Sequence, residues 1–303
     1  MRALVISGGR SKGAFAGGVA QYLIEEAHHH YDLLIGTSTG SLLISHLALQ
    51  KIEKIKEIYT SVTQNDIFSN CPFFIYKKNG IETIGIDHLN VLKNFYIGSK
   101  TFGESHNLLQ LIKSTITIEE FNSLKNGPKD IVVTVSNLYL IQVEYKSIND
   151  YSYEEFCEWI WISCNYTPFM SLVKKNGCEY ADGGLGTMVP IEDAIKRGAT
   201  TIDAIILQTE VTHLNRMPSK NVFSLLTNMF AFMLDRIEDH IRIGKFVANH
   251  NGVIINFYYT PTILTTNSLI FDKDKMSAWW QSGFNYAKFK SMESSELEPQ
   301  KIN

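Results

Sequence analysis

The chain has 303 residues, of which 45% are hydrophobic, 12% aromatic and 19% charged. These fractions are typical of a globular protein and exclude an intrinsically disordered chain, a collagen-like repeat and a coiled coil. The 28 basic and 31 acidic side chains leave a formal net charge of −3, so no overall basic field exists to bind nucleic acid.

The cysteines and the N-terminus indicate the compartment. The four cysteines form no C-x-x-C pair. The chain begins directly with the strand-like run Leu4-Val5-Ile6, without the pattern of a signal peptide. No apolar run approaches the roughly 18 residues of a transmembrane helix. We therefore expect a protein of the reducing cytoplasm.

The first predicted elements alternate between strands and helices. Residues 2–7 and 32–37 have the pattern of buried strands, and each is followed by a helical pattern, at 13–26 and at 39–49. Such a βαβα start predicts a parallel sheet.

The rest of the chain has weaker but readable patterns. Between residues 51 and 125, short helical patterns alternate with turn signals. Beyond this region we predict strands at 130–135, 139–145, 203–208 and 252–259, and helices at 153–164 and 221–249. No linker-like segment divides the chain, so residues 1–290 are predicted to form a single domain. Residues 291–303 lack apolar spacing and are predicted to be a poorly ordered polar tail.

The predicted strand at 32–37 and the helix after it enclose a G-x-S-x-G motif. The motif is Gly36-Thr37-Ser38-Thr39-Gly40. A serine nucleophile on a tight turn from strand to helix needs small neighbours, because the turn is strained and the hydroxyl must stand clear. By itself the pentapeptide is equally compatible with an ordinary turn.

A glycine-rich loop joins the first predicted strand to its helix. It reads Gly8-Gly9-Arg10-Ser11-Lys12-Gly13, and its amides at a helix N-terminus are suited to hold an anion or an oxyanion. The spacing of these residues does not match either of two common nucleotide-binding loops. The dinucleotide fingerprint needs a glycine where Arg10 stands, and the P-loop needs Lys-Ser/Thr where Ala14-Phe15 follow Gly13.

An aspartate before two glycines lies after a predicted hairpin. Gly183 and Gly184 leave space around Asp182, as the presentation of a general base requires. An ordinary Asp-Gly turn explains the same residues.

No histidine is placed to assist Ser38. His46 lies eight residues further along the predicted helix, about 12 Å along its axis, whereas a general base must lie within about 3 Å. The run His28-His29-His30 has no suitably spaced cysteine or carboxylate and is interpreted as a solvated loop, not a metal site. An α/β-hydrolase is disfavoured because its elbow follows several strands, whereas Ser38 follows the second.

Together the three motifs resemble the patatin-like phospholipase family. The marks of that family are a glycine-rich loop after the first strand, a G-x-S-x-G elbow after the second and a D-G-G/A motif, in this order. The stretch from Ile162 to Phe169, and on through Asp182 to Val189-Pro190, is also similar to the family's approach to its catalytic aspartate. The resemblance covers at least residues 2–210.

The resemblance implies both a fold and an activity. The fold is a three-layer α/β/α sandwich with a mostly parallel central sheet. The activity is that of a serine acyl hydrolase, which cleaves carboxylic esters of lipids through a Ser-Asp dyad without a metal or another cofactor. The substrate would be a lipid ester, of the phospholipase A or lysophospholipase type, met in transient contact with a membrane surface.

The resemblance also assigns roles to residues. Ser38 would be the nucleophile and Asp182 the proton acceptor, while the loop from Gly8 to Gly13, through Gly9, Arg10, Ser11 and Lys12, would form the oxyanion hole. Gly36 and Gly40 belong to the nucleophile elbow, and Gly183 and Gly184 to the motif of the proton acceptor. Two residues depart from the family pattern. Arg10 replaces a glycine, and Lys12 stands where the family often has arginine.

Two other functions stay open at this point. One is an acyltransferase of related fold, in which the serine is commonly flanked by a histidine, whereas Thr37 and Thr39 flank Ser38. The other is a non-catalytic relative, which either binds lipid or a protein partner because Arg10 has altered the loop, or keeps the motifs in a purely structural role.

The predicted helix 221–249 has a wide apolar arc. At about 100° per residue its apolar positions span roughly 200°, more than one buried face requires. Either the helix packs on two sides, or the edge with Phe223, Phe230 and Leu234 borders a groove for acyl chains.

Overall fold

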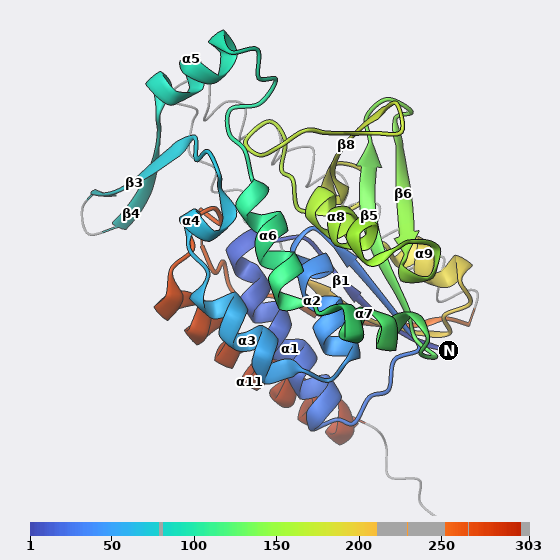
Figure 1. Ribbon diagram of the computed structural model, residues 1–303. Helices are drawn as coiled ribbons and strands as arrows, with labels where there is room; N and C mark the ends of the chain where they lie inside the picture. Colours follow the sequence, from blue (N-terminus) through green and yellow to red (C-terminus); the bar gives the residue numbers. More distant parts are fainter. Residues whose placement is uncertain (79–80, 211–228, 230–251, 266, 298–303) are drawn as a thin grey trace, which may run out of the picture.

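The computed structural model describes residues 1–78, 81–210, 229, 252–265 and 267–297 (Figure 1). The strands are β1 (Arg2–Ile6), β2 (Leu33–Thr37), β3 (Phe73–Lys78), β4 (Ile81–Ile86), β5 (Asp130–Asn137), β6 (Gln142–Ser147), β7 (Val173–Lys175), β8 (Cys178–Asp182), β9 (Thr201–Ile206) and β10 (Ile254–Tyr259). The α-helices are α1 (Gly13–Glu25), α2 (Thr39–Ala48), α3 (Ile52–Ser61), α4 (Gln64–Ile67), α5 (His88–Tyr96), α6 (His106–Thr115), α7 (Ile118–Lys125), α8 (Tyr153–Ser163), α9 (Ile191–Lys196) and α11 (Lys273–Leu297). Short 3-10 turns are η1 (Arg10–Lys12), η2 (Ile148–Asp150) and η3 (Gly183–Leu185).

The central sheet is mostly parallel, as the βαβα start predicts. Its order is β10-β9-β1-β2-β5-β8-β7, with β6 paired to β5. The pairs from β10 to β5 are parallel, whereas β6 and β8 run antiparallel to β5 and β7 runs antiparallel to β8. A separate antiparallel hairpin, β3–β4, stands away from this body together with α5 (Figure 1).

Helices cover both faces of the sheet. In β1, Leu4 and Ile6 join a core with residues of α1, α2, α8 and α11, whereas Ala3 and Val5 join a second core with Ile191 of α9. Side chains alternate between the faces of a strand, so a strand that is apolar at every position must be buried on both. The predicted three-layer α/β/α sandwich is confirmed.

The C-terminal helix α11 packs closely against α1. The indole of Trp280 is buried and donates a hydrogen bond to Oε1 of Gln21 at 2.8 Å. A side chain at Gly17 or Gly18 would overlap Trp280, so these glycines allow the two helices to approach. We did not predict this helix. It continues to Leu297, so residues 291–297 of the predicted polar tail are helical, and residues 298–303 lie outside the described residues.

The prediction of a strand at 139–145 was wrong about where the strand begins. The strand β6 begins only at Gln142. Asn137 caps the preceding turn, because its Oδ1 accepts hydrogen bonds from the amides of Tyr139 at 3.1 Å and Leu140 at 3.0 Å. Apolar residues therefore occupy an exposed turn that their pattern assigned to a strand.

Two further predictions concern the helix at 221–249 and membrane-spanning helices. The predicted helix 221–249, with its proposed lipid edge, lies outside the described residues, apart from Met229. Of the helices in the described part of the chain, none combines the length and the apolar character needed to span a bilayer.

Candidate active site

The ends of β2 and β8 meet along one edge of β5. Thr37 of β2 pairs with Thr134, and Asp182 of β8 pairs with Val135, the next residue of β5. The other edge of β5 is occupied by β6 from Val132 to Asn137. Since a strand has two edges, β2 and β8 lie end to end on the same edge. Ser38, which follows Thr37, is thereby brought to Asp182.

Ser38 lies on a strained turn between β2 and α2. Its φ of 52° and ψ of −119° are a conformation that residues with a side chain rarely adopt. A Cβ on Gly36 would lie 2.4 Å from the carbonyl carbon of Gly40, and a Cβ on Gly40 would lie 2.2 Å from the oxygen of Ile6. The two glycines of the motif therefore allow the turn to fold tightly against β1.

Ser38 and Asp182 are in direct contact. The hydroxyl of Ser38 donates a hydrogen bond to Oδ2 of Asp182 at 2.7 Å, and the amide of Gly184 donates to Oδ1 at 2.7 Å. Ser38 is 6% exposed and Asp182 5% exposed. Burial raises the pKa of Asp182 to about 6, against the lowering effect of these hydrogen bonds and of the positive charge of Arg10. A carboxylate of raised pKa is a stronger base toward a serine hydroxyl.

Only part of the predicted oxyanion loop has free amides. The amide of Ser11 donates to the carbonyl of Ser268 at 3.1 Å, and that of Lys12 to the carbonyl of Gly9 at 3.2 Å. The amide of Gly13 is bound to the carbonyls of η1. The amides of Gly8, Gly9 and Arg10 have no acceptor among the described residues, and these three residues line a small cavity with Ser38 and Asp182.

Arg10 is held firmly by both its backbone and its side chain. Its φ of 54° lies in the left-handed region that favours glycine, the residue that the family has here. Its carbonyl accepts hydrogen bonds from the hydroxyl of Tyr59 at 2.6 Å and from that of Thr39 at 3.2 Å.

The guanidinium of Arg10 faces the site. It lies 3.8 Å from the centre of the Tyr166 ring and donates to Oγ of Ser268 at 2.9 Å. Within the described part of the chain it has no carboxylate in ion-pair distance. The site thus holds a cation that no acidic side chain pairs with there.

The end of α8 supports both members of the pair. Oγ of Ser163 accepts a hydrogen bond from the amide of Ser38 at 2.8 Å, and the thiol of Cys164 donates to the carbonyl of Ser38 at 3.1 Å. The carbonyl of Asn165 accepts from the amide of Asp182 at 2.9 Å. Sequence reasoning singled out this stretch without assigning roles to its residues. The available signal was a run of polar residues at the end of an apolar helix.

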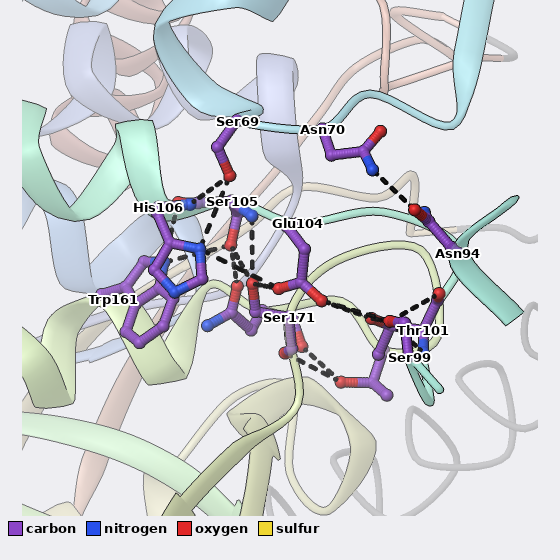
Figure 2. A network of polar contacts seen from close by, with 12 residues as sticks. Ser69, Asn70, Asn94, Ser99, Thr101, Glu104, Ser105, His106, Trp161 and Ser171 are labelled. Carbon is purple, nitrogen blue, oxygen red and sulfur yellow. Dashed lines mark hydrogen bonds and ion pairs between the residues drawn. The ribbon is translucent and has the colours of Figure 1, made fainter. Parts of the chain in front are cut away.

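A buried polar network ties this support to the segment before α6. The indole of Trp161 donates to the carbonyl of Ser105 at 2.9 Å, and the amide of Ser105 donates to Oγ of Ser171 at 3.0 Å (Figure 2). The hydroxyl of Ser105 donates to Oδ1 of Asn165, and that of Ser171 donates to Glu104. The loop behind Asp182 is therefore fixed by a second segment, remote in sequence.

An apolar cavity extends from Ser38. It encloses about 810 Å³ of empty space, part of it open to solvent. Aliphatic and aromatic side chains of α2, α3 and α6, and of the end of α4 with the residue after it, line the cavity, among them Leu42, Ile58, Phe68, Leu111 and Ile112. Its lining is that of a site for an apolar ligand, and Ser38 forms part of its wall.

His46 does not contact Ser38. Its Nε2 lies 3.1 Å from the carbonyl oxygen of Thr115, and burial lowers the pKa of the ring. Within the described residues, the hydroxyl of Ser38 donates to a carboxylate and to no imidazole.

Comparisons with known proteins identify a family for most of the chain. The family model of patatin-like phospholipases matches residues 4–195. Among solved structures, the chain is similar to VipD from Legionella pneumophila, with a TM-score of 0.48 and 14% sequence identity, over 97% of this chain and 67% of that chain. No curated protein matches the chain.

The buried Asp182 predicts a pH-dependent effect on stability. Its pKa is raised from 3.8 to about 6 in the folded state, so its contribution to stability is fully present below about pH 4 and is lost as the pH rises through 6. Ionised Asp182 then destabilises the fold by about 3 kcal/mol. Asparagine keeps the oxygen that binds Gly184 and carries no charge. We expect Asp182→Asn to raise Tm by about 3 °C or more at pH 8 and by less toward pH 4.

Thermal unfolding across this pH range measures the effect. Asp150→Asn, at an exposed aspartate, is the matched control for the removal of one carboxylate. An Asp182→Asn variant with a Tm at or below that of the unmodified protein at pH 8 would contradict the expected cost of burial.

Proposed function

Because the chain belongs to the patatin-like phospholipase family, whose members hydrolyse acyl esters of lipids, we propose that Ser38 and Asp182 form its catalytic dyad. The observation that carries the proposal is the 2.7 Å hydrogen bond from the Ser38 hydroxyl to Asp182. Both residues lie within the part of the chain that the family model matches. The substrate is a lipid with a carboxylic ester bond.

In the proposed mechanism Asp182 serves twice as a proton acceptor. It takes the hydroxyl proton of Ser38 as the serine oxygen attacks the ester carbonyl, and the amides of Gly8, Gly9 and Arg10 stabilise the negative charge on the carbonyl oxygen. The alcohol leaves with that proton, and the acyl group stays on Ser38. Asp182 then takes a proton from a water molecule, whose oxygen attacks the acyl carbon. The bond between the acyl carbon and the Ser38 oxygen breaks, the acid leaves, and Asp182 returns the proton to the serine oxygen.

Two features of the site favour a phospholipid as the substrate. The apolar cavity beside Ser38 accommodates an acyl chain. The guanidinium of Arg10, which lines the small cavity at Ser38, offers two or more donors to the phosphate of a head group. We therefore propose a phospholipase A or lysophospholipase activity, in which Arg10 has a role that the usual glycine cannot supply.

The geometry favours this proposal over the other two functions. A transferase of the Ser-His type needs an imidazole at the serine, and the carboxylate of Asp182 occupies that place. A non-catalytic relative would need neither a raised pKa at Asp182 nor amides without an acceptor beside Ser38. Both features are present among the described residues.

Removing either member of the dyad tests the proposal directly. We expect Ser38→Ala and Asp182→Asn each to lower kcat/KM for a nitrophenyl butyrate by about a thousandfold or more, since neither variant can generate the serine nucleophile. Circular dichroism and Tm verify the fold. His46→Gln is the matched control and should stay within about threefold. A large loss in His46→Gln with an active Asp182→Asn would support the transferase instead.

The apolar cavity predicts a dependence on chain length. We expect Leu111→Trp to fill the space and to lower the rate on a palmitoyl ester by about tenfold relative to a butyryl ester. Gln110→Trp, on the exposed face of the same helix, is the control and should leave the ratio of the two rates unchanged. An equal loss on both esters in Leu111→Trp would mean that the cavity does not hold the acyl chain.

Arg10 predicts a difference between charged and neutral substrates. Arg10→Gly restores the residue that a φ of 54° favours, so turnover of a neutral nitrophenyl ester should be preserved or raised. Turnover of a phospholipid should fall by about tenfold, because the phosphate loses its cation. Arg10→Lys, which keeps the charge, should recover part of that loss. A collapse on the neutral ester would show instead that the side chain is needed for the chemistry itself.

A further inference from the structure

Two neighbouring projections expose apolar side chains. The helix α5 and the residue after it carry Leu89, Leu92, Phe95, Tyr96 and Ile97, and the β5–β6 turn carries Leu138, Tyr139, Leu140 and Ile141. We call these nine residues the apolar rim. Tyr96 is 93% exposed and Ile141 91% exposed. Single exposed apolar residues are ordinary, but a contiguous group indicates a binding surface.

The spacing of residues along the helix α5 places its apolar face outward. At 100° per residue, Leu89, Leu92 and Tyr96 share one face, and the buried residues Val91 and Asn94 lie opposite. Asn94 anchors the helix, because its Nδ2 donates to the carbonyl of Phe102 at 2.7 Å. Its Oδ1 accepts from Asn70 at 2.8 Å (Figure 2). The exposed face of α5 is therefore mostly apolar, whereas exposed helix faces are usually polar.

The two parts of the apolar rim are joined at β8. Lys100, just after α5, forms an ion pair with Glu179 at 2.8 Å, and the carbonyl of Glu179 accepts from the amide of Leu138 at 2.8 Å. Because β5 continues beyond the end of β2, the β5–β6 turn lies past the edge of the sheet at which Ser38 stands. In Figure 1 both projections point away from the body on the same side.

A row of aromatic rings connects α5 with the candidate active site. The ring centres of Phe95 and Phe102 are 5.7 Å apart, those of Phe102 and Phe169 are 5.5 Å apart, and Phe169 stacks on Tyr166 at 5.5 Å. Tyr166 in turn lies against the guanidinium of Arg10. The apolar rim is therefore continuous with the site through packed side chains.

Basic side chains accompany the apolar rim. Lys93 lies on the exposed face of α5 and has no acidic partner in the described part of the chain. Lys100 and Lys174 both lie within ion-pair distance of Glu179, at 2.8 Å and 3.8 Å. Two lysines thus share one carboxylate and Lys93 has none within the described residues, so the three lysines carry an excess of positive charge in a chain whose net charge is −3.

We propose that the apolar rim binds the surface of a lipid aggregate that contains anionic phospholipids, and that this contact delivers the ester to Ser38. Exposed aliphatic and aromatic side chains enter the region between head groups and acyl chains, and nearby lysines bind anionic head groups. The inference rests on the proposed function for its substrate, but the contact itself is measured separately from hydrolysis. A hydrophobic protein partner would not require the lysines.

Vesicle binding by the full chain tests the surface. Co-sedimentation with vesicles of phosphatidylcholine mixed with phosphatidylserine should capture the protein, and vesicles of phosphatidylcholine alone should capture less. The double variants Leu92→Glu with Tyr96→Glu, and Tyr139→Glu with Ile141→Glu, should each weaken binding by about tenfold or more. Ile118→Glu, at an exposed isoleucine that begins α7 on another side of the molecule, is the matched control and should bind like the unmodified protein.

Hydrolysis distinguishes a failed surface from a failed function. In the rim variants the ratio of vesicle hydrolysis to hydrolysis of a monomeric nitrophenyl ester should fall by about tenfold. Equal binding by the rim variants and the unmodified protein, or no binding by the unmodified protein, overturns the proposed surface. Loss of both activities in proportion overturns it too, since the rim would then act on the site itself. Binding without hydrolysis of any ester by the unmodified protein leaves the surface in place and refutes the proposed function.

Discussion

The candidate site depends on the fact that two strands share one edge of β5. This strand has eight residues, and its first part pairs with β2 while its last part pairs with β8. A shift of β8 by two residues along β5 would move Asp182 by about 7 Å and separate it from Ser38. A shift by one residue would turn its side chain to the other face of the sheet. The register of β5 therefore determines whether the pair exists. Burial fixes that register, because Val132 packs in one core whereas Val133 and Val135 pack in the other.

The same packing gives the site its chemical character. Burial of Asp182 raises its pKa and so destabilises its charged form, while it increases the basicity of the carboxylate. Ser38 and Arg10 both have positive φ angles, each of which costs on the order of 1–3 kcal/mol when the residue has a side chain. These costs persist because separate contacts enforce each conformation. Ser163 and Cys164 hold the backbone of Ser38, and Tyr59 and Thr39 hold that of Arg10.

The sequence predicted the features that depend on local signals. The first strands and helices have strong apolar patterns, and the elbow and the glycine loop fall at their junctions, so the positions of Ser38 and of the loop were predictable. The meeting of β2 and β8 could not be predicted from local patterns, because it brings together Ser38 and Asp182, which are 144 positions apart. The supporting roles of Ser163 and Asn165 arise from the same long-range pairing. The start of β6 was misjudged because the turn at Leu138–Ile141 is apolar, as a strand would be. An apolar turn breaks the usual pattern, and the proposed lipid surface supplies a reason for it.

The proposed surface and the proposed chemistry are linked by the cost of moving an acyl chain through water. Each methylene group exposed to water costs about 0.8 kcal/mol, so a chain of about 15 methylenes would cost about 12 kcal/mol if it left a bilayer unaided. An apolar cavity beside Ser38 recovers that free energy only after the chain has arrived. A rim that sits in the lipid surface removes much of the aqueous path, and so lowers the barrier to arrival as well. This argument explains why exposed apolar residues on α5 and the β5–β6 turn are useful at this end of the sheet. On the opposite edge the same residues would promote aggregation without bringing any lipid closer to the serine.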